Sequence, residues 1–462
     1  SMSRQRFLYT LIIFLLLPWA MLHLLWRAKR QKAYLNHWGE RLGYFARRKP
    51  SNQPGMPCLW LHAVSVGETR AAQPLVAALK ARYPQHHLLM THMTPTGREA
   101  SETLFGDQVE HCYLPYDTPG AMRRFLARFE PSMGIMMETE IWPNLLAECR
   151  IAGVPVCLLN ARLSERSARR YARWPNFTRQ ILPFFSVIGA QTAEDATRFT
   201  ALGAAAISVT GNIKFDIDPP PEQLALSRIF RDHLGDRPVW LAASTREGEE
   251  VLILDAWLAA MKVEKTRAKK VGADETAKRL DRADTAIANT VMDRSTLAMS
   301  PDALLVIVPR HPQRFDDVVQ WVAERGLSLQ RRSENQAIKP GTQVVLGDSM
   351  GEMFAWYAAV DVAFIGGSLK NYGCQNLIEA CAVGTPVLIG PSTFNFAEAA
   401  REALACGAAR QIMNADELVQ QANCLLADAH QRQNMSLAGR EFVLRHRGAT
   451  ARSLALVANL LQ

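Results

Sequence analysis

The stretch CLWLHAVSVGE, residues 58–68, decides the fold, because an apolar run leads through a glycine turn into a helical pattern. A strand followed by such a turn and a helix places backbone N–H groups and the first helical residues at one edge of a parallel sheet. Glu68 lies at this helix start. A carboxylate there often only caps the helix or interacts with its dipole, so the spacing alone favours a structural role over catalysis.

On both sides of this stretch, short apolar runs alternate with helical patterns. The first series predicts strands at 58–63, 88–93, 109–114, 133–138, 154–160, 187–190 and 207–210. After Pro219-Pro220-Pro221, a second series predicts strands near 239–243, 304–308, 343–347, 361–365 and 386–389. Strands that alternate with helices form parallel sheets with right-handed crossovers. The sequence therefore predicts an α/β protein with two Rossmann-like domains and ligands at the carboxyl ends of the strands.

The composition is that of a globular protein of two or three domains. The chain has 462 residues, of which 48% are hydrophobic and 21% charged. Its eight cysteines form no C-x-x-C pair, which argues against a disulfide scaffold or a structural zinc site and favours a reducing, cytosolic compartment. Residues 1–49 hold ten basic side chains and one acid, whereas the remaining 413 residues hold 43 of each. The net charge of +9 therefore reflects a basic N-terminal segment and does not indicate nucleic-acid binding.

The N-terminal segment predicts membrane attachment. Twenty residues without a charge run from Phe7 to Trp26, which is enough to span a ~30 Å hydrocarbon core. The heavier positive flank follows this run and favours a cytoplasmic body, with its cations at an anionic leaflet. A signal peptide is the main alternative, although the apolar run is long for one and no clear small-x-small cleavage site follows. A buried helix and a monotopic anchor also remain open, because Pro18 and His23 weaken the span.

Three segments follow from these patterns. We expect a membrane anchor with its basic flank over 1–32, an N-terminal domain over 33–218 and a C-terminal domain over 219–462. A charged stretch at about 262–298 interrupts the second series of strands. A solvated surface excursion is favoured there over a regulatory or partner-binding role.

Charged side chains follow two strands of the N-terminal domain. Glu138 and Glu140 come at the end of the apolar run 133–138, where charges need partners or a function. Lys214, in GNIKFD (211–216), could meet an anion in an interdomain cleft or pair with a surface acid. The Asp-Ile-Asp triplet at 216–218 resembles a metal-binding D-x-D, but it lies in a linker beside three prolines and is interpreted as chance.

In the second domain, consecutive strand ends carry groups suited to phosphate. STREGEE (244–250), VPRHP (308–312), GDSMGEM (347–353) and GGS (366–368) each follow a predicted strand. Arg310 is a candidate phosphate ligand, and Glu379 at a helix start could accept two hydrogen bonds from a ribose diol. This convergence is more specific than any single glycine motif.

These motifs together resemble the bacterial Kdo transferases of lipid A biosynthesis, where Kdo is 3-deoxy-D-manno-oct-2-ulosonic acid. The similarity runs from the anchor to about residue 400 and rests on HAVSVGE (62–68), MTPTG (93–97), METEIWPN (137–144), NARLS (160–164), GNIKFD, STREGEE, VPRHP, GGS, QNLIEA (375–380) and GPSTFNF (390–396). The resemblance implies a GT-B glycosyltransferase on the cytoplasmic face of the inner membrane. It also implies CMP-Kdo as donor, the tetraacylated lipid A precursor as acceptor, and transfer without a metal or cofactor.

The resemblance also implies roles for particular residues. Glu68 matches the catalytic base, and Glu138 and Lys214 match positions that stabilise the transition state. The positions that match CMP-binding segments are Pro309, Arg310, Met350, Gly351, Glu352, Asn376, Leu377, Ile378 and Glu379. Direct attack by the acceptor hydroxyl, with Glu68 removing its proton, would invert the anomeric configuration.

The chain departs from the family pattern in two places, the charged insertion described above, which typical members are not expected to have, and one motif. The family usually has G-G-H-N-P-L-E where this chain has Gly373-Cys374-Gln375-Asn376-Leu377-Ile378-Glu379, which puts a role for the histidine in doubt. Two alternatives stay open: a membrane-associated GT-B transferase with another nucleotide sugar, and a non-enzymatic membrane-tethered nucleotide- or lipid-binding protein. A dehydrogenase is disfavoured, since no G-x-G-x-x-G follows a strand with an acid downstream.

Overall fold

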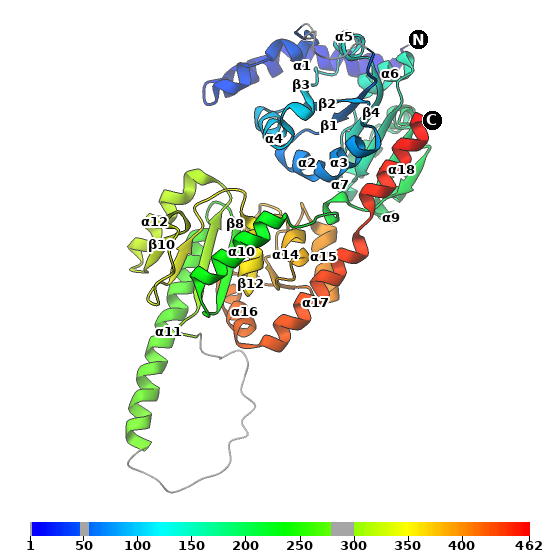
Figure 1. Cartoon of the computed structure of the whole chain (residues 1–462). Helices are drawn as coiled ribbons and strands as arrows, with labels where there is room; N and C mark the ends of the chain where they lie inside the picture. Colours follow the sequence, from blue (N-terminus) through cyan, green and yellow to red (C-terminus); the bar gives the residue numbers. More distant parts are fainter. Residues whose placement is uncertain (1, 47–54, 279–299) are drawn as a thin grey trace. The chain divides into compact units, whose positions relative to one another are not determined.

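The computed structural model describes residues 2–46, 55–278 and 300–462, with main-chain structure alone for 274–278. The chain divides into two compact units (Figure 1). Unit 1 comprises Ser1–Asp216 with His446–Gln462, and unit 2 comprises Ile217–Arg445.

Unit 1 is built on a seven-stranded sheet of order β3-β2-β1-β4-β5-β6-β7 in which adjacent strands pair in parallel. The seven strands expected in this half of the chain are confirmed. Their bounds are β1 Cys58–His62, β2 His87–His92, β3 Glu110–Tyr113, β4 Pro131–Met137, β5 Val156–Ala161, β6 Val187–Ala190 and β7 Ile207–Val209. The helices are α1 Arg4–Ala28, α2 Val66–Ala71, α3 Gln73–Arg82, α4 Pro95–Phe105, α5 Pro119–Phe129, α6 Pro143–Ala152, α7 Glu165–Ala172, α8 Pro175–Ile181, α9 Ala193–Ala201 and α18 Ala449–Leu461.

Both faces of the first sheet are covered by apolar side chains, which explains why β1 reads as one continuous apolar run. Successive side chains of a strand point to opposite faces. Accordingly, Trp60 packs in one cluster with Phe125 of α5, whereas Leu59 and Leu61 pack in another with Leu75 of α3. Packing on both faces of the sheet therefore fixes the carboxyl end of β1 and the start of the loop that follows it.

The C-terminal helix corrects the expected domain division. Residues 446–462 were expected in the second domain, but they belong to unit 1, where Ala449 and Val457 of α18 are buried in the same cluster as β1. Asp216 accepts hydrogen bonds from the backbone N–H groups of Gly448 (2.8 Å) and Thr450 (2.6 Å), which caps the start of α18. Helical periodicity shows that a helix has an apolar face, but not which sheet that face covers.

Unit 2 has a second seven-stranded parallel sheet, of order β10-β11-β9-β8-β12-β13-β14. Its strands are β8 Val239–Thr245, β9 Leu304–Pro309, β10 Leu329–Arg331, β11 Val344–Leu346, β12 Val362–Ile365, β13 Val387–Ile389 and β14 Ala409–Gln411. The helices are α10 Pro221–Leu234, α11 Glu249–Lys278, α12 Phe315–Glu324, α13 Met353–Ala359, α14 Ile378–Ala382, α15 Ala397–Cys406, α16 Ala415–Ala427 and α17 Ala429–His446. The sequence prediction missed β10 and β14, which are three-residue edge strands without an apolar run.

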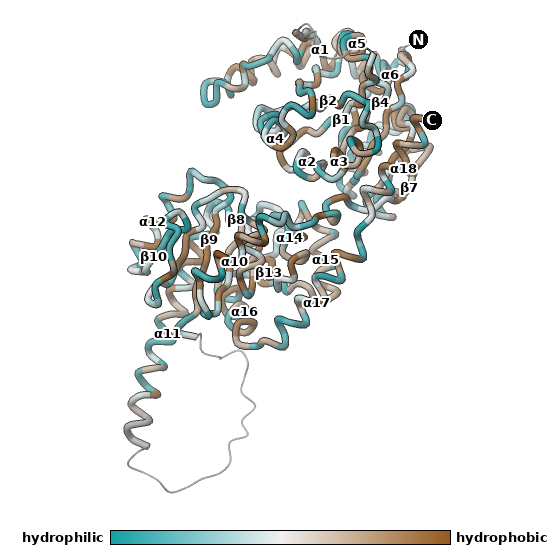
Figure 2. Tube along the Cα trace, in the orientation of Figure 1, coloured by the Kyte–Doolittle hydropathy of each residue, from teal (hydrophilic) through white to brown (hydrophobic). Residues whose placement is uncertain are grey.

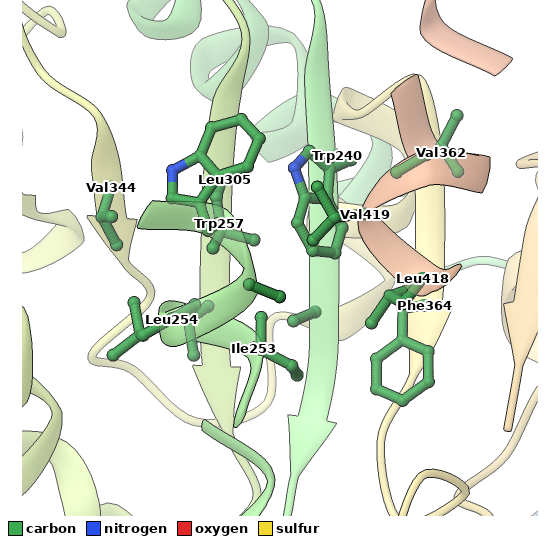
Figure 3. Packing of buried hydrophobic residues seen from close by; sticks show 14 of the residues in the cluster. Trp240, Ile253, Leu254, Trp257, Leu305, Val344, Val362, Phe364, Leu418 and Val419 are labelled. Carbon is green, nitrogen blue, oxygen red and sulfur yellow. The ribbon is translucent and has the colours of Figure 1, made fainter. Parts of the chain in front are cut away.

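The core of unit 2 lies between its sheet and helices α11, α12 and α16 (Figure 3). Trp240 of β8 and Trp257 of α11 meet edge to face, with their ring centroids 5.8 Å apart. Leu305, Phe364 and Leu418 surround this pair. The burial of α11 against β8 fixes the loop between them, which carries the STREGEE motif.

The charged insertion expected at about 262–298 begins as a continuation of α11. This helix extends to Lys278, and most side chains from 262 to 273 are exposed, with hydrophilic residues prominent along them (Figure 2). Residues 262 to 273 are thus mostly solvent-exposed, and the interpretation of the insertion as a solvated surface excursion stays a prediction. The remainder of the predicted insertion, residues 279–298, lies outside the described residues.

Helix α1 contains the predicted apolar segment. In the described part of the chain it is the one helix long and apolar enough to cross a membrane, by length and composition. Most of its large apolar side chains, such as Leu15 and Trp19, are exposed.

Candidate active site

Glu68 lies in the first turn of α2, where the loop after β1 holds its carboxyl group. Ser65 is the N-cap of α2 and its hydroxyl accepts the N–H of Glu68 (3.4 Å). In return, the Glu68 carboxylate accepts the N–H of Val64 (2.8 Å) through Oε2. The sequence preference for Ser before a helix and an acid in its first turn thus produces a reciprocal cap. The side chain is half-buried, which leaves part of it accessible.

Glu138 and Lys214, the other predicted catalytic residues, lie beside Glu68. Because β1 and β4 are adjacent parallel strands, their carboxyl ends meet at one edge of the sheet. Glu138 directly follows β4 in a left-handed conformation (φ 60°) and is buried. Its Oε1 is 3.6 Å from Nζ of Lys214, which belongs to a short 3-10 helix at Ile213–Phe215. The structure therefore brings together the three residues that the sequence singled out.

This environment makes Glu68 an unusually strong base for a carboxylate. Burial raises the pKa of Glu68 to about 8, and the negative charges of Glu138 and Glu140 act in the same direction. The Val64 N–H and the Lys214 ammonium lower this pKa but do not outweigh burial. A group that takes up a proton near neutral pH is matched to general base catalysis.

Two further residues, His62 and Trp142, lie at this edge of the sheet, and the sequence analysis gave neither a defined role. His62 Nδ1 is 2.7 Å from the Thr91 hydroxyl, and its Nε2 is 4.0 Å from Oε2 of Glu140. Trp142 Nε1 donates to the same Glu140 oxygen (2.6 Å). Burial lowers the pKa of His62 to about 3, so its ring is neutral. The signal in the sequence was present, since His62 ends β1 within HAVSVGE.

The corresponding edge of unit 2 is organised by Glu249, in the first turn of α11. Its carboxylate is fully buried and accepts four backbone N–H groups. Oε1 accepts those of Arg246 (2.8 Å) and Gly367 (2.7 Å), and Oε2 accepts those of Leu369 (3.0 Å) and Lys370 (3.4 Å). Glu249 thus joins the loop after β8 to the GGS loop after β12.

Close backbone packing accompanies these hydrogen bonds. A Cβ atom on Gly366 would lie 2.3 Å from the carbonyl oxygen of Ser244, so glycine is required there. Ser244 itself is left-handed, with φ 52°. The Tyr372 hydroxyl donates to the Glu247 carbonyl (3.0 Å), and the Arg246 guanidinium lies over the Tyr372 ring, 4.4 Å from its centroid.

The predicted CMP-binding residues follow neighbouring strands of the second sheet. Pro309 ends β9 and is buried, while the Arg310 N–H donates to the Thr245 carbonyl (2.9 Å). After β11, Met350 is exposed and Gly351 has φ 76°. Glu352 forms an ion pair with Arg332 (3.3 Å). Because β9 and β11 are adjacent, these segments meet at one edge of the sheet.

In the last predicted CMP-binding segment, 376–379, fewer side chains are accessible than the prediction required. Asn376 Oδ1 accepts the N–H of Ile378 (2.8 Å) and so shapes the entry to α14. The side chains of Leu377 and Ile378 are fully buried in the core, so only their main chain can face the loop edge. Glu379 lies half-buried in the first turn of α14. Cys374 replaces the usual family glycine while keeping a left-handed φ of 72°.

No group of three or more His, Cys, Asp or Glu side chains that could hold a metal ion occurs within residues 2–46, 55–278 and 300–462.

Comparisons with known proteins agree with this architecture. A family model described as 3-Deoxy-D-manno-octulosonic-acid transferase (kdotransferase) matches residues 36–217. The chain is 42% identical to a 3-deoxy-D-manno-octulosonic acid transferase of Bordetella pertussis over 441 residues, covering 93% of this chain and 94% of that protein. It is 34% identical to the transferase of that name from Haemophilus influenzae over 464 residues, covering 99% of each. A solved glycosyltransferase from Rickettsia africae shares the fold, with a TM-score of 0.54 at 12% identity over 88% of this chain and 99% of that one.

Two doubly wound parallel sheets, each with polar groups at its carboxyl edge, define the GT-B fold, which the solved glycosyltransferase shares. The similarity extends over nearly the full length of both curated relatives. The chain belongs to the 3-deoxy-D-manno-octulosonic acid (Kdo) transferases.

Proposed function

We propose that this chain transfers Kdo from CMP-Kdo to the tetraacylated lipid A precursor (lipid IVA), inverting the anomeric configuration, with Glu68 as general base. The observation that carries the assignment of the base is the half-buried Glu68 carboxyl group, whose pKa burial raises to about 8. Glu138 and Lys214, which match the family's catalytic positions, lie beside it.

The chemistry explains why this base is needed. The acceptor is a primary sugar hydroxyl, which is a poor nucleophile at neutral pH. Glu68 removes its proton as the oxygen attacks the anomeric carbon, an effect typically worth 10²–10⁴-fold in rate. Bond breaking to phosphate gives the anomeric carbon oxocarbenium character. Lys214, held 3.6 Å from Glu138, contributes positive potential as charge develops on the departing CMP.

Unit 2 supplies the proposed donor site. Arg310 would bind phosphate, and Glu379 would accept hydrogen bonds from the ribose diol. The remaining positions are Pro309, Met350, Gly351, Glu352, Asn376, Leu377 and Ile378, with Leu377 and Ile378 acting through their main chain because their side chains are buried. The proposed transfer uses no metal ion, no cofactor and no nucleic acid.

We assign the protein to the cytoplasmic face of the inner membrane, attached through α1. Arg27, Lys29, Arg30 and Lys32 follow the apolar part of α1 and suit an anionic leaflet, each contributing about 1 kcal/mol. The acceptor is itself a lipid, so attachment keeps the enzyme where its acceptor is.

Incubation of the purified chain with CMP-Kdo and lipid IVA, followed by mass spectrometry, tests the proposal. We expect lipid products heavier by one or more Kdo residues, and NMR of the product should show inversion at the anomeric carbon. A parallel incubation with other nucleotide sugars serves as control. Transfer from another donor but not from CMP-Kdo, or a product that retains configuration, would contradict the proposed reaction.

A further inference from the structure

Helix α1 is tied to unit 1 near its beginning by polar contacts that a membrane-spanning helix would not make. The Tyr9 hydroxyl donates to Oδ2 of Asp117 (2.7 Å). The Thr10 hydroxyl exchanges hydrogen bonds with the side chain of Asn144 (3.0 and 3.2 Å). Thr10, Asp117 and Asn144 are all buried. Figure 1 shows this end of α1 beside α6, whose first residues also bind Asp117.

The chain that follows α1 returns to the same place in unit 1. Two short 3-10 helices, Lys32–Leu35 and Trp38–Leu42, follow α1. The Tyr116 N–H then donates to the carbonyl of Arg41 (2.8 Å), one residue away from the Asp117 that binds Tyr9. The chain before and after the apolar segment therefore contacts adjacent residues of one folded unit.

These contacts are incompatible with a span from Phe7 to Trp26. At 1.5 Å per residue, Tyr9 would lie about 11 Å from the middle of that span, inside a hydrocarbon core that extends about 15 Å to each side. Asp117 and Asn144 would be drawn into the hydrocarbon with it. Polar and ionisable groups are expensive there, and the water-soluble sheet of unit 1 would have to follow them.

The exposed face of α1 suits the surface of a membrane. Leu8, Leu11, Leu15, Trp19, Leu22 and Trp26 recur at helical spacing, and all are exposed. His23 packs between Trp19 and Trp26, with ring centroids 5.4 and 5.8 Å apart. Trp side chains concentrate at the headgroup level of bilayers, and in a span Trp19 would lie far below it.

We propose that α1 is an in-plane anchor: it lies along an anionic lipid surface with its apolar stripe in the headgroup–acyl boundary and both ends on the same side as unit 1. This proposal rests on the membrane attachment proposed above and specifies its geometry. The stripe supplies apolar burial, and Arg27, Lys29 and Arg30 at its end supply attraction to anionic lipid. The Tyr9 and Thr10 contacts fix unit 1 at a constant height above the surface.

Spin labels at three positions two helical turns apart test this geometry. Leu8→Cys, Leu15→Cys and Leu22→Cys put labels on one face of α1 in the full-length chain, which is bound to vesicles of phosphatidylethanolamine and phosphatidylglycerol. Accessibility to oxygen and to a water-soluble nickel complex reports the depth of each label, and the unsubstituted chain gives the background from native cysteines.

We expect the three labels at the same shallow depth. A spanning helix would instead place neighbouring labels about 10 Å apart along the bilayer normal, and that pattern would overturn the proposal. Failure of the chain to bind the vesicles at all would reject membrane attachment itself, which is a separate outcome from a wrong orientation.

Discussion

Glu68 and Glu249 occupy equivalent places in the two units, yet their surroundings differ. Each lies in the first turn of the helix that follows the first strand of its sheet, β1 or β8. Among the described residues, Glu68 accepts one backbone N–H, that of Val64. Glu249 accepts four, from two different loops.

The difference shows how partners decide what a buried carboxylate does. Burial raises the pKa of both carboxyl groups, but at Glu249 four backbone N–H groups counteract this shift and occupy both oxygens. That side chain is therefore a structural link between loops. Glu68 has a lone pair available and negative neighbours that favour taking up a proton. Strand-end position alone does not distinguish a base from a loop organiser, whereas the number of donors does.

The largest effect is expected from Glu68→Gln, which keeps the side-chain shape and removes the basic oxygen. We expect turnover to fall about 10²–10⁴-fold, because general base catalysis is lost. CMP binding, measured by calorimetry, should stay unchanged, since the proposed donor residues are all in unit 2. Turnover within threefold of wild type would mean that Glu68 is only a cap of α2.

Glu249→Gln should instead cost stability. Each carboxylate oxygen accepts two N–H groups, so either orientation of a glutamine amide points its NH₂ at two donors. We expect a loss of about 3 kcal/mol in the free energy of unfolding, measured in denaturant.

Glu250→Gln is the matched control for this change. Glu250 is equally buried but binds Arg314 and Thr245 side chains, not the GGS loop. Hydrogen exchange of residues 366–370 should accelerate in Glu249→Gln and not in Glu250→Gln. Equal exchange of this loop in both variants would contradict the role of Glu249 as its organiser.

The stability effect of Glu68→Gln should depend on pH in a defined direction. The pKa of Glu68 is about 8 in the folded chain, against an ordinary 4.5, so its contribution to stability is present below pH 4.5 and is lost as pH rises through 8. Glutamine cannot ionise, so the variant should gain stability relative to wild type by about 1–2 kcal/mol at pH 9, after allowance for solvent screening. Thermal unfolding at pH 5 and pH 9 measures this, and a difference that is constant across pH would contradict it.

The smallest effect is expected at Cys374, in the loop after β12 whose first residues bind Glu249. Cys374 has φ 72°, a conformation that costs a side chain roughly 1 kcal/mol but costs glycine little. We therefore expect Cys374→Gly to stabilise unit 2 by less than about 1 kcal/mol, because loss of the buried thiol and the greater freedom of glycine in the unfolded chain both reduce the gain. A clear loss of stability in denaturant unfolding would show that packing of the thiol outweighs backbone strain.

The sequence predicted what depends on strand ends and missed what depends on distant packing. Glu68, Glu138 and Lys214 come together because parallel strands bring their carboxyl ends to one edge, and alternating apolar runs predict that edge. The choice of these three residues as catalytic came from the resemblance to the Kdo transferases, because spacing alone favoured a structural role for Glu68. The contacts of Glu249 join residues more than a hundred positions apart, which no local pattern reports. The placement of α18 on unit 1 was missed for the same reason, since amphipathicity does not name the partner.

The helix at the N-terminus illustrates this limit again. Twenty uncharged residues predicted a membrane segment, but Tyr9 and Thr10 read as ordinary members of it. Their partners, Asp117 and Asn144, become visible only when α6 is placed beside α1. Composition thus predicts affinity for lipid, while the orientation that we propose rests on polar contacts that only the three-dimensional structure shows.

The pH dependence of kcat/KM in wild type and in Glu138→Gln tests the central claim most directly, because it reports the pKa of the essential base in the free enzyme. We predict that kcat/KM of wild type rises with pH with an apparent pKa of about 8. In Glu138→Gln the whole profile should move to lower pH, whatever the loss of rate, because a negative charge that raises the pKa of Glu68 is gone. A profile that is flat between about pH 6 and 9, or one that Glu138→Gln leaves in place, would contradict the assignment of Glu68 as the base.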